Sequence, residues 1–329
     1  MGGGPRARSD RSPAPRSVAS LPRTPDWEKV RVKRLAWLLL LGCTDSDPTV
    51  VVYDGLDDEP GRMVVAQAQR ELPFTVKRLG DTEATKTAGL VHRLRLEASF
   101  PQADVFVCGE PLSVAALAAE GVLLSEGEVL AGRVRGLVVH SDREDVQCPS
   151  SWLDLASDRW HDQGLAVADP RYGSTGAHLG VLRSVLGETE YRFLLRGLNE
   201  VGVRLVAGGN RAVVDEVAQG EVAFGATDAD DVAAAQALGQ PVRFLPLPLD
   251  QVRGPWIMTA EARLVVPSTP EGVMYLEWMR KNGAKVFRSA APGWLHPDQL
   301  PEGLRYQPDR ASEEQSVAVE EALQIFGAS

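Results

Sequence analysis

Three carboxylates lie within four positions of this chain, at Asp228, Asp230 and Asp231. They come directly after the apolar run at 222–226 and just before an alanine-rich stretch typical of a helix. Carboxylates so close together repel one another, and a hard cation would relieve the repulsion because such ions prefer oxygen ligands. An aspartate in the first turn of a helix also gains about 0.3–1 kcal/mol from the helix dipole. The cluster therefore predicts either a metal site or a helix cap.

Two further acidic residues stand where a predicted strand gives way to a predicted helix. Asp57 begins the acidic run before Pro60, and Glu110 comes directly before Pro111. Carboxylates at these positions would add oxygen ligands to the predicted metal site. Proline is common at the first position of a helix, and an acidic residue ahead of it also fits an ordinary helix start. Both interpretations stay open for Asp57 and Glu110.

Two other junctions combine hydroxyl groups with a basic side chain. The first is the segment 81–87, with the sequence DTEATKT, and the second is 169–176, with the sequence DPRYGSTG. Free amide groups at a helix N-terminus, together with hydroxyls and a cation, make a pocket that suits an anion. A capped helix after an ordinary turn is the structural alternative for both segments. The side chains predicted to bind the anion are Thr82, Thr85, Lys86, Arg171, Tyr172, Ser174 and Thr175.

The elements that would position these residues alternate between strands and helices. Such alternation predicts an α/β fold with mostly parallel sheets covered by helices on both faces. The exception is 136–140, an isolated strand that fits a crossing between two lobes. The other predicted strands are 49–53, 74–79, 104–108, 164–168, 203–206, 222–226, 242–247 and 263–266. The predicted helices are 61–72, 83–98, 111–120, 174–186, 188–201, 210–219, 230–238, 270–281 and 312–326.

The composition argues against several classes of protein. The 329 residues are 44% hydrophobic and 24% charged, as in globular proteins. The first 43 residues hold nine of the 35 basic and three of the 45 acidic residues, so the remainder carries a net charge of −16. Such an acidic chain is a poor partner for nucleic acid or for an anionic membrane surface. Whether Cys108 and Cys148 form a disulfide stays open, because one sequence does not show that they are close.

The chain carries none of the common catalytic motifs. It has no HExxH, Cys-x-x-Cys, Walker or Gly-x-Ser-x-Gly pattern. An enzyme would need a nucleophile next to a base, or a bound cofactor, and the sequence indicates neither. We therefore expect a protein that is not an enzyme and that has no catalytic cofactor.

The N-terminal part of the chain has the pattern of an export signal. A basic segment at 29–34 precedes an apolar run at 35–42, which is too short to span a bilayer. The run ends in LLGC, a sequence similar to the cleavage site of bacterial lipoproteins. This pattern predicts a leader and signal peptide over 1–43, a lipid on Cys43 and a tether at 44–48. A buried N-terminal strand or helix is the alternative.

Six segments occur in an order that resembles a known family. They are VVVYDGLDDE, DTEATKTAGLVHRL, PQADVF, PSSWLDLASDRW, GLAVADPRYGSTGAH and VVDEVAQGEVAFGATDADD. Over residues 49–240 the chain resembles the periplasmic ferric-ion-binding proteins of bacterial ABC importers, within the family-1 extracellular solute-binding proteins. The resemblance implies a type II periplasmic-binding-protein fold, in which two α/β lobes joined by hinge strands close over one ligand. It also implies delivery of that ligand to an ABC permease and its ATPase.

The resemblance bears on the ligand as well. Ferric-binding members offer a His or acidic residue after the first strand, where this chain has Asp57, and a Glu after the third, near Glu110. Their tyrosine pair has no counterpart, because 227–231 of this chain reads TDADD. We expect an iron ion or another hard metal ion, with a bound anion completing its shell. A binding protein for an oxyanion or organophosphonate is the alternative, and a two-lobed sensor or enzyme is a further one.

The resemblance also sets the expected organisation of the chain. The first lobe is expected over 49–138, with about 241–290 returning to it. The second lobe is expected over 139–240, with the tail at about 291–329 packing on it. The whole is expected to be a monomer in the periplasm or at the cell surface. It would touch the membrane only through its lipid anchor and would bind a small inorganic ligand.

Overall fold

The computed structural model describes most of the chain. The described residues are 47–56, 58–80, 86–171, 173–300 and 308–327. The predicted signal peptide, the lipid attachment at Cys43 and most of the predicted tether lie outside them. Within the described ranges, no helix has both the length and the apolar character needed to cross a membrane.

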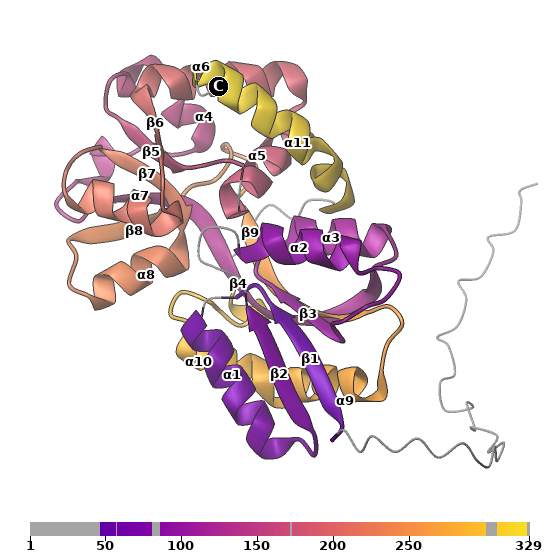
Figure 1. The fold of residues 1–329 in the computed structure, drawn as a ribbon. Helices are drawn as coiled ribbons and strands as arrows, with labels where there is room; N and C mark the ends of the chain where they lie inside the picture. The colour runs from indigo at the N-terminus through magenta and orange to yellow at the C-terminus, as the bar shows by residue number, and fades with distance from the viewer. Residues whose placement is uncertain (1–46, 57, 81–85, 172, 301–307, 328–329) are drawn as a thin grey trace, which may run out of the picture. The chain divides into compact units, whose positions relative to one another are not determined.

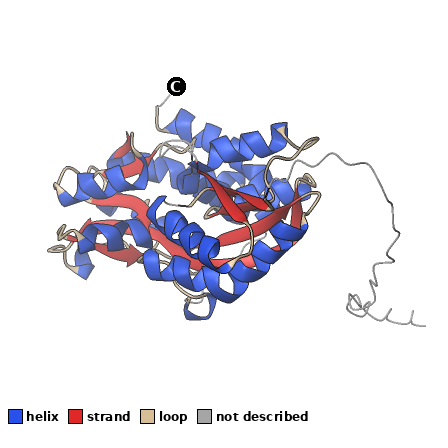
Figure 2. Ribbon diagram, turned by 60° about the horizontal axis from the view of Figure 1, so that its bottom comes forward, coloured by secondary structure: helices blue, strands red, loops and turns tan. Residues whose placement is uncertain are grey.

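Strands in parallel and antiparallel pairs form the centre of the described chain (Figure 1), with helices on both sides of them (Figure 2). The strand order is β2-β1-β3-β9-β4-β7-β5-β6, and β8 pairs with β4 outside this path. The strands are β1 (Thr49–Asp54), β2 (Thr75–Gly80), β3 (Val105–Cys108), β4 (Leu123–His140), β5 (Leu165–Ala168), β6 (Val203–Val206), β7 (Phe224–Asp228), β8 (Val242–Pro246) and β9 (Ile257–Val265). The helices are α1 (Asp58–Glu71), α2 (Lys86–Leu96), α3 (Pro111–Ala119), α4 (Trp152–Leu155), α5 (Gly173–Leu186), α6 (Glu188–Gly202), α7 (Gly209–Ala218), α8 (Ala229–Ala237), α9 (Pro270–Trp278), α10 (Ala284–Ala290) and α11 (Pro308–Ile325).

The long strand β4 connects two groups of strands. Its first part pairs antiparallel with β9 as far as Val134, and its second part pairs antiparallel with β7 from Arg135 onward. The first lobe therefore contains β1, β2, β3 and β9, and the second contains β5, β6, β7 and β8. This is the two-lobed type II architecture predicted from the sequence. The prediction included only residues 136–140 of the connecting strand.

Each lobe has an apolar core on both faces of its parallel strands. In the first lobe β1 pairs parallel with β2 and β3, and its adjacent residues Val52 and Tyr53 belong to different cores. In the second lobe β5 pairs parallel with β6 and β7, and Ala166 and Val167 divide between two cores in the same way. Parallel strands end at a common edge, where open α/β sheets usually bind ligands.

The chain returns to the first lobe later than the sequence suggested. The strand β8 pairs with β4 through contacts such as His140 with Val242, and so stays in the second lobe. The return is made by β9, which pairs with both β3 and β4. Further on, Leu295 pairs with Gly132 of β4, and Trp294 packs in a core of the first lobe. Hydrophobic pattern alone predicts a strand but does not select its neighbour.

The two cysteines of the described chain are not paired. Cys108 lies in a core of the first lobe and Cys148 in a core of the second, and both are free thiols. Burial raises the pKa of the Cys108 thiol above its usual value. The disulfide that the sequence left open is absent because the two residues belong to separate cores.

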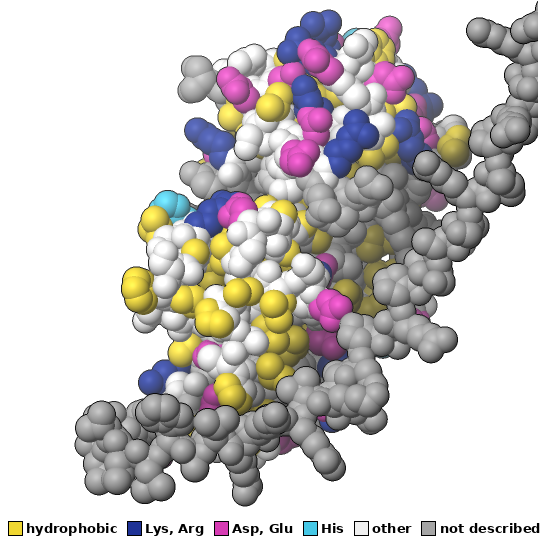
Figure 3. Space-filling view, turned by 90° about the vertical axis from the view of Figure 1, so that its right-hand side faces the viewer, with side chains coloured by type: hydrophobic (Ala, Val, Ile, Leu, Met, Phe, Trp, Pro, Cys, Tyr) yellow, Lys and Arg dark blue, Asp and Glu magenta, His cyan; other side chains and the backbone are white. Residues whose placement is uncertain are grey.

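The C-terminal helix α11 packs along α5 and also contacts α3 of the first lobe (Figure 1). Its residue Ala311 shares one apolar cluster with Leu112 of α3 and Val181 of α5. Its residue Glu321 forms an ion pair with Arg183 of α5 at 3.1 Å. Acidic and basic side chains lie side by side across the upper part of the face in Figure 3. The helix thus binds to α5 by both apolar and charged contacts.

The close approach of α5 and α11 depends on Gly180. A Cβ at this position would lie 2.8 Å from the carbonyl oxygen of Ala311 and 3.0 Å from the Cα of Gln315. We expect Gly180→Ala to lower the free energy of unfolding by about 1–2 kcal/mol, because overpacking outweighs the gain in helix propensity. Urea denaturation measures this loss, with Ser184→Ala on the same helix as control. A Gly180→Ala protein as stable as the wild type would show that the two helices separate at little cost.

Candidate ligand-binding site

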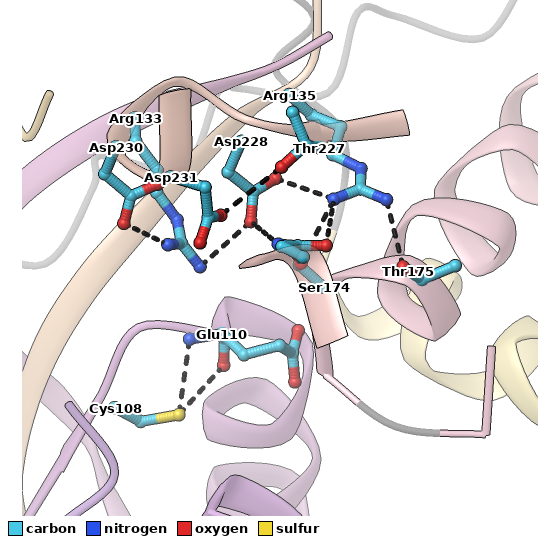
Figure 4. A network of polar contacts seen from close by, with 11 residues as sticks. Cys108, Glu110, Arg133, Arg135, Ser174, Thr175, Thr227, Asp228, Asp230 and Asp231 are labelled. Carbon is cyan, nitrogen blue, oxygen red and sulfur yellow. Dashed lines mark hydrogen bonds and ion pairs between the residues drawn. The ribbon is translucent and has the colours of Figure 1, made fainter. Parts of the chain in front are cut away.

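The three clustered carboxylates lie where β7 meets α8 (Figure 4). Asp228 is the last residue of β7, and Asp230 and Asp231 lie in the first turn of α8. One carboxylate oxygen of each residue lies within 4.8 Å of the others. The structure therefore brings these three predicted ligands together.

Asp228 is fully buried and binds positive groups of the chain itself. Its Oδ1 accepts a hydrogen bond from Arg135 at 2.9 Å, and its Oδ2 lies 3.2 Å from Arg133. Asn210 donates a further hydrogen bond to Oδ2 at 2.8 Å. Burial alone would raise the pKa of Asp228, but the two guanidinium groups outweigh it and hold the pKa below its usual value. A cation bound at Asp228 would therefore have to displace an arginine.

Arg135 organises the polar side chains around it. It is completely buried, and its Nη1 donates hydrogen bonds to Asp228, to Ser174 Oγ and to Asn210 Oδ1. Its Nη2 donates to Thr175 Oγ1 at 3.0 Å. A buried guanidinium is destabilising unless its charge is compensated, and Asp228 supplies the opposite charge. The four partners bind Nη1 and Nη2, whereas the buried Nε has no hydrogen-bond partner among the described residues. Arg135 therefore fixes the two hydroxyls relative to β4.

Arg133 lies two positions before Arg135 on β4, so the two side chains share one face of the strand. The side chain of Arg133 is 14% exposed, whereas that of Arg135 is not exposed at all. Arg133 forms ion pairs with Asp228 at 3.2 Å and with Asp230 at 2.5 Å. Of these two arginines, Arg133 is the one that solvent reaches.

Ser174 and Thr175 stand in the first turn of α5. The helix begins at Gly173, whose φ of +59° is a conformation that glycine adopts without strain. The Oγ of Ser174 accepts a hydrogen bond from Asn210 at 3.1 Å, in addition to that from Arg135. The first amide groups of a helix have no partner within it, so this end of the helix favours negative charge. The two hydroxyls and the helix end together suit an anion.

Glu110 caps the N-terminus of α3. Its carboxylate accepts hydrogen bonds from the backbone amides of Leu112 at 2.7 Å and Ser113 at 2.9 Å. Burial raises the pKa of Glu110, although these amides and the charge of Arg133 act in the opposite direction. The helix-start interpretation therefore accounts for the contacts of Glu110. Figure 4 draws no hydrogen bond or ion pair between Glu110 and the three aspartates.

The capping role predicts a loss of stability on truncation. We expect Glu110→Ala to lower the free energy of unfolding by about 1–2 kcal/mol, because two helix amides lose their acceptor. The matched control is Glu120→Ala at the other end of α3, where the exposed ion pair with Arg95 is worth less than about 1 kcal/mol. Urea denaturation of both variants measures the difference. Equal losses would contradict the capping role.

Two further predicted anion ligands, Arg171 and Lys86, lie at or just before the start of a helix. Arg171 lies in the turn before α5, is 57% exposed and pairs with Asp169 at 2.8 Å. Lys86 is the first residue of α2. The other predicted ligands, which lie outside the described residues, are Asp57, Thr82, Thr85 and Tyr172.

Sequence reasoning missed three residues of the network, namely Arg133, Arg135 and Asn210. The two arginines come at alternate positions directly before the apolar run at 136–140. Alternate charged residues continuous with a buried strand are the signal that could have identified them, because a strand face directs them toward one side. Asn210 near the start of a predicted helix gave no signal beyond that of a cap.

The chain belongs to the bacterial extracellular solute-binding proteins. The family model with that description matches residues 81–290, which is more than half of the chain. A comparison with curated protein sequences gave no match. The class predicted from the six sequence segments is thus confirmed.

Solved structures with the same fold include proteins for different ligands. Iron-bound HitA from Pseudomonas aeruginosa has a TM-score of 0.68 and 18% identity, covering 84% of this chain and 99% of that chain. The ferric binding protein from Campylobacter jejuni has a TM-score of 0.70 and 14% identity, covering 84% and 99%. AfuA from Actinobacillus pleuropneumoniae, with fructose-6-phosphate bound, has a TM-score of 0.68 and 13% identity, covering 85% and 99%. At these identities the likeness establishes the fold.

Proposed function

We propose that this chain is the extracytoplasmic binding protein of an ABC importer for a small organic phosphate or phosphonate. The anionic group of the ligand would lie at the N-terminus of α5, beside Ser174 and Arg133. Hydroxyl or ammonium groups of the same ligand would face Asp230 and Asp231. The closed, loaded protein would then deliver the ligand to a permease and its ATPase.

The observation that carries the proposal is the complete burial of Arg135 against two hydroxyls of α5. Arg135 donates to Ser174 Oγ at 3.3 Å and to Thr175 Oγ1 at 3.0 Å. Groups held in this way need little rearrangement when a ligand binds, so less free energy is lost in ordering them. Hydroxyls at a helix N-terminus, with a guanidinium nearby, are the donors that a phosphoryl group requires.

The acidic residues favour an organic ligand over a bare anion. Asp230 is buried and Asp231 is partly buried beside it. Their charges would repel inorganic phosphate, whereas a ligand with hydroxyl or ammonium groups can donate hydrogen bonds to them. Among proteins of this fold, AfuA has been solved with fructose-6-phosphate bound, which supports an organic phosphate as the ligand class.

Capture of iron or another hard cation is the second candidate. It is favoured by the three carboxylate oxygens within 4.8 Å of one another, and by iron-bound HitA among the structures of this fold. Against it, Asp228 already pairs with Arg133 and Arg135. A metal ion would have to replace at least one of these guanidinium groups, and any that remained would repel it.

Isothermal titration of ligand-stripped full-length protein distinguishes the two candidates. The probes are fructose 6-phosphate, 2-aminoethylphosphonate, inorganic phosphate, Fe³⁺ supplied as its citrate complex, and Ca²⁺. We expect heat from at least one organic phosphate or phosphonate and little from inorganic phosphate alone. Heat from a metal ion only, with none from the organic phosphates, would overturn the proposal.

Two variants locate the binding group. We expect Ser174→Ala to weaken binding of the organic phosphate about tenfold, because one hydrogen bond to a charged group is lost. Ser184→Ala, further along the same helix, is the control and should bind like the wild type. Asp231→Asn tests the metal candidate, since it removes one carboxylate charge. Binding that is lost in Asp231→Asn but unchanged in Ser174→Ala would favour the metal.

The lipid anchor is a separate part of the proposal. Cys43 follows the apolar run at 35–42, and we propose that its thiol carries the lipid that holds a monomeric protein at the membrane surface. In a bacterial host that processes lipoproteins, the wild type should sediment with membranes and Cys43→Ser should not. Membrane fractionation followed by immunoblotting measures this. Equal distribution of both forms would contradict an anchor at Cys43.

A further inference from the structure

Trp294 packs against Arg133, the partly buried arginine of the site. The guanidinium carbon of Arg133 lies 4.5 Å from the centroid of the Trp294 ring, and the tryptophan is 7% exposed. Tryptophan is the aromatic side chain that attracts a cation over its face most strongly. The geometry is therefore that of a cation–π pair, in which the ring limits where the guanidinium can move.

The position of Trp294 is set by the surrounding structure. Its neighbour Leu295 exchanges two backbone hydrogen bonds with Gly132, at 2.8 and 3.0 Å, immediately before Arg133 in β4. The ring of Phe287 meets the indole at a centroid distance of 5.4 Å and an angle of 62°. The indole is thus held against the strand that carries Arg133.

Gly109, directly after β3, leaves room for the indole. A Cβ at Gly109 would lie 3.3 Å from Cη2 of Trp294, closer than most real Cβ contacts. Gly109 directly precedes Glu110, the cap of α3. The indole therefore lies between the β3–α3 junction and Arg133.

The same segment also contacts the acidic partner of Arg133. Gly293 has a φ of +86°, and a Cβ there would lie 2.5 Å from the Cα of Asp230. The backbone next to Trp294 thus lies directly against the start of α8, in the second lobe. One short segment of the chain therefore contacts both members of the ion pair between Arg133 and Asp230.

We infer that Trp294 is a positioning residue of the ligand site. It holds the guanidinium of Arg133 beside Asp228 and Asp230, so that the anionic group of an organic phosphate meets a donor already in place. The inference rests on the proposed function for the identity of the ligand. The pairing of Trp294 with Arg133 does not depend on the proposed function, so the pairing and the effect on ligand binding are tested separately.

The pairing is tested by fluorescence without any ligand. The sequence contains seven tryptophans, so the emission of Trp294 is taken as the difference between the wild type and Trp294→Phe. The same difference is measured in an Arg133→Met background. We expect its wavelength or intensity to change, because a charge over the ring alters the emission. Arg280→Met is the control, since that side chain is 57% exposed and pairs with Glu128.

The positioning role is tested by titration with fructose 6-phosphate and 2-aminoethylphosphonate. We expect Trp294→Leu to weaken binding about tenfold, and Trp294→Tyr, which keeps an aromatic face, to remain within about threefold of the wild type. The control is Trp278→Leu, which removes another tryptophan from the same core. It should reduce thermal stability in the same way as Trp294→Leu while leaving affinity unchanged.

The outcomes separate the two proposals. Equal loss of affinity in Trp294→Leu and Trp278→Leu would show that Trp294 acts only through packing and would overturn the inference. An unchanged emission of Trp294 in Arg133→Met would overturn it as well. If no organic phosphate binds the wild-type protein, the proposed function fails, and the fluorescence result alone decides whether Trp294 positions Arg133.

Discussion

Replacement of Arg135 by methionine is expected to lower the free energy of unfolding by about 3–5 kcal/mol. The substitution leaves Asp228 buried with only one of its two guanidinium partners, Arg133 at 3.2 Å. It also removes a donor from Ser174 and Thr175, both of which are buried. Urea denaturation, with linear extrapolation to zero denaturant, measures the loss.

The control for this prediction is an exposed arginine with equally good geometry. Arg95 pairs with Glu120 at 2.7 Å, and the two side chains are 45% and 40% exposed. Solvent screens such a pair, so Arg95→Met should cost less than about 1 kcal/mol. A loss in Arg135→Met no greater than that in Arg95→Met would contradict the structural role of the buried network.

A second substitution shows whether the loss comes from an unpaired charge. In Arg135→Met/Asp228→Leu both members of the buried pair are apolar, so the carboxylate no longer lacks its partner. Replacing a whole buried ion pair by apolar residues is often close to neutral. We therefore expect the double variant to be more stable than Arg135→Met alone. A double variant that is less stable would indicate that hydrogen bonds to Ser174 and Asn210 dominate.

Local pattern predicted most of the elements of this fold. The helix expected over 188–201 is α6 (Glu188–Gly202), and the strand expected over 203–206 is β6 (Val203–Val206). Both have a clear hydrophobic period, and the glycine at the end of α6 adopts a positive φ, as helix ends often require.

The first part of β4 could not be predicted in the same way. Residues 125–128 read SEGE, and Arg133 and Arg135 interrupt the apolar pattern that follows. Such a composition is typical of a loop or a solvated edge. The segment is nevertheless a strand, because β9 supplies hydrogen bonds along most of its length and the Asp228 network compensates the arginine charges.

The site could be predicted only in part, because local sequence does not specify which strands pair. The position of the three aspartates at the end of a strand follows from local sequence, and the structure places them there. Their arginine partners lie at least 93 residues earlier in the chain. The register that joins Arg135 to Asp228 belongs to the pairing of β4 with β7, which no local pattern specifies. The positive groups near the cluster were therefore missed.

His178 is a titratable group that interacts electrostatically with Arg135 and Asp228 of the same network. It is buried in α5, its ring stacks on Trp256 at 5.5 Å, and it meets Trp152 at 4.8 Å. Burial lowers the pKa of His178 well below its usual value, and the charge of Arg135 lowers it further, while Asp228 acts in the opposite direction. The imidazole therefore stays neutral in the folded protein at pH values where it is protonated in the unfolded chain.

This difference predicts a loss of stability on mild acidification. Below about pH 6.5 the unfolded chain binds one more proton at His178 than the folded protein does, so stability rises with pH in this range by about 1.4 kcal/mol per unit. The contribution of neutral His178 to the free energy of unfolding is fully present above pH 6.5 and is lost as the pH falls. Between pH 6.5 and 5 we expect a loss of about 2 kcal/mol from this residue. Urea denaturation at a series of pH values measures it.

Replacement of His178 by an aromatic residue that does not titrate separates its contribution to the pH dependence of stability from those of the other titratable groups. His178→Phe keeps a planar side chain between the two tryptophans, and its stability should depend less on pH by about 1.4 kcal/mol per unit below pH 6.5. The comparison matters because the raised pKa of buried Glu110 has the opposite effect: its contribution to stability is lost as the pH rises. His92→Phe, at an exposed position of α2, is the matched control and should keep the wild-type profile. Identical profiles for His178→Phe and the wild type would show that the imidazole is protonated in the folded protein, and the compensated network around Arg135 would then have to include a second cation.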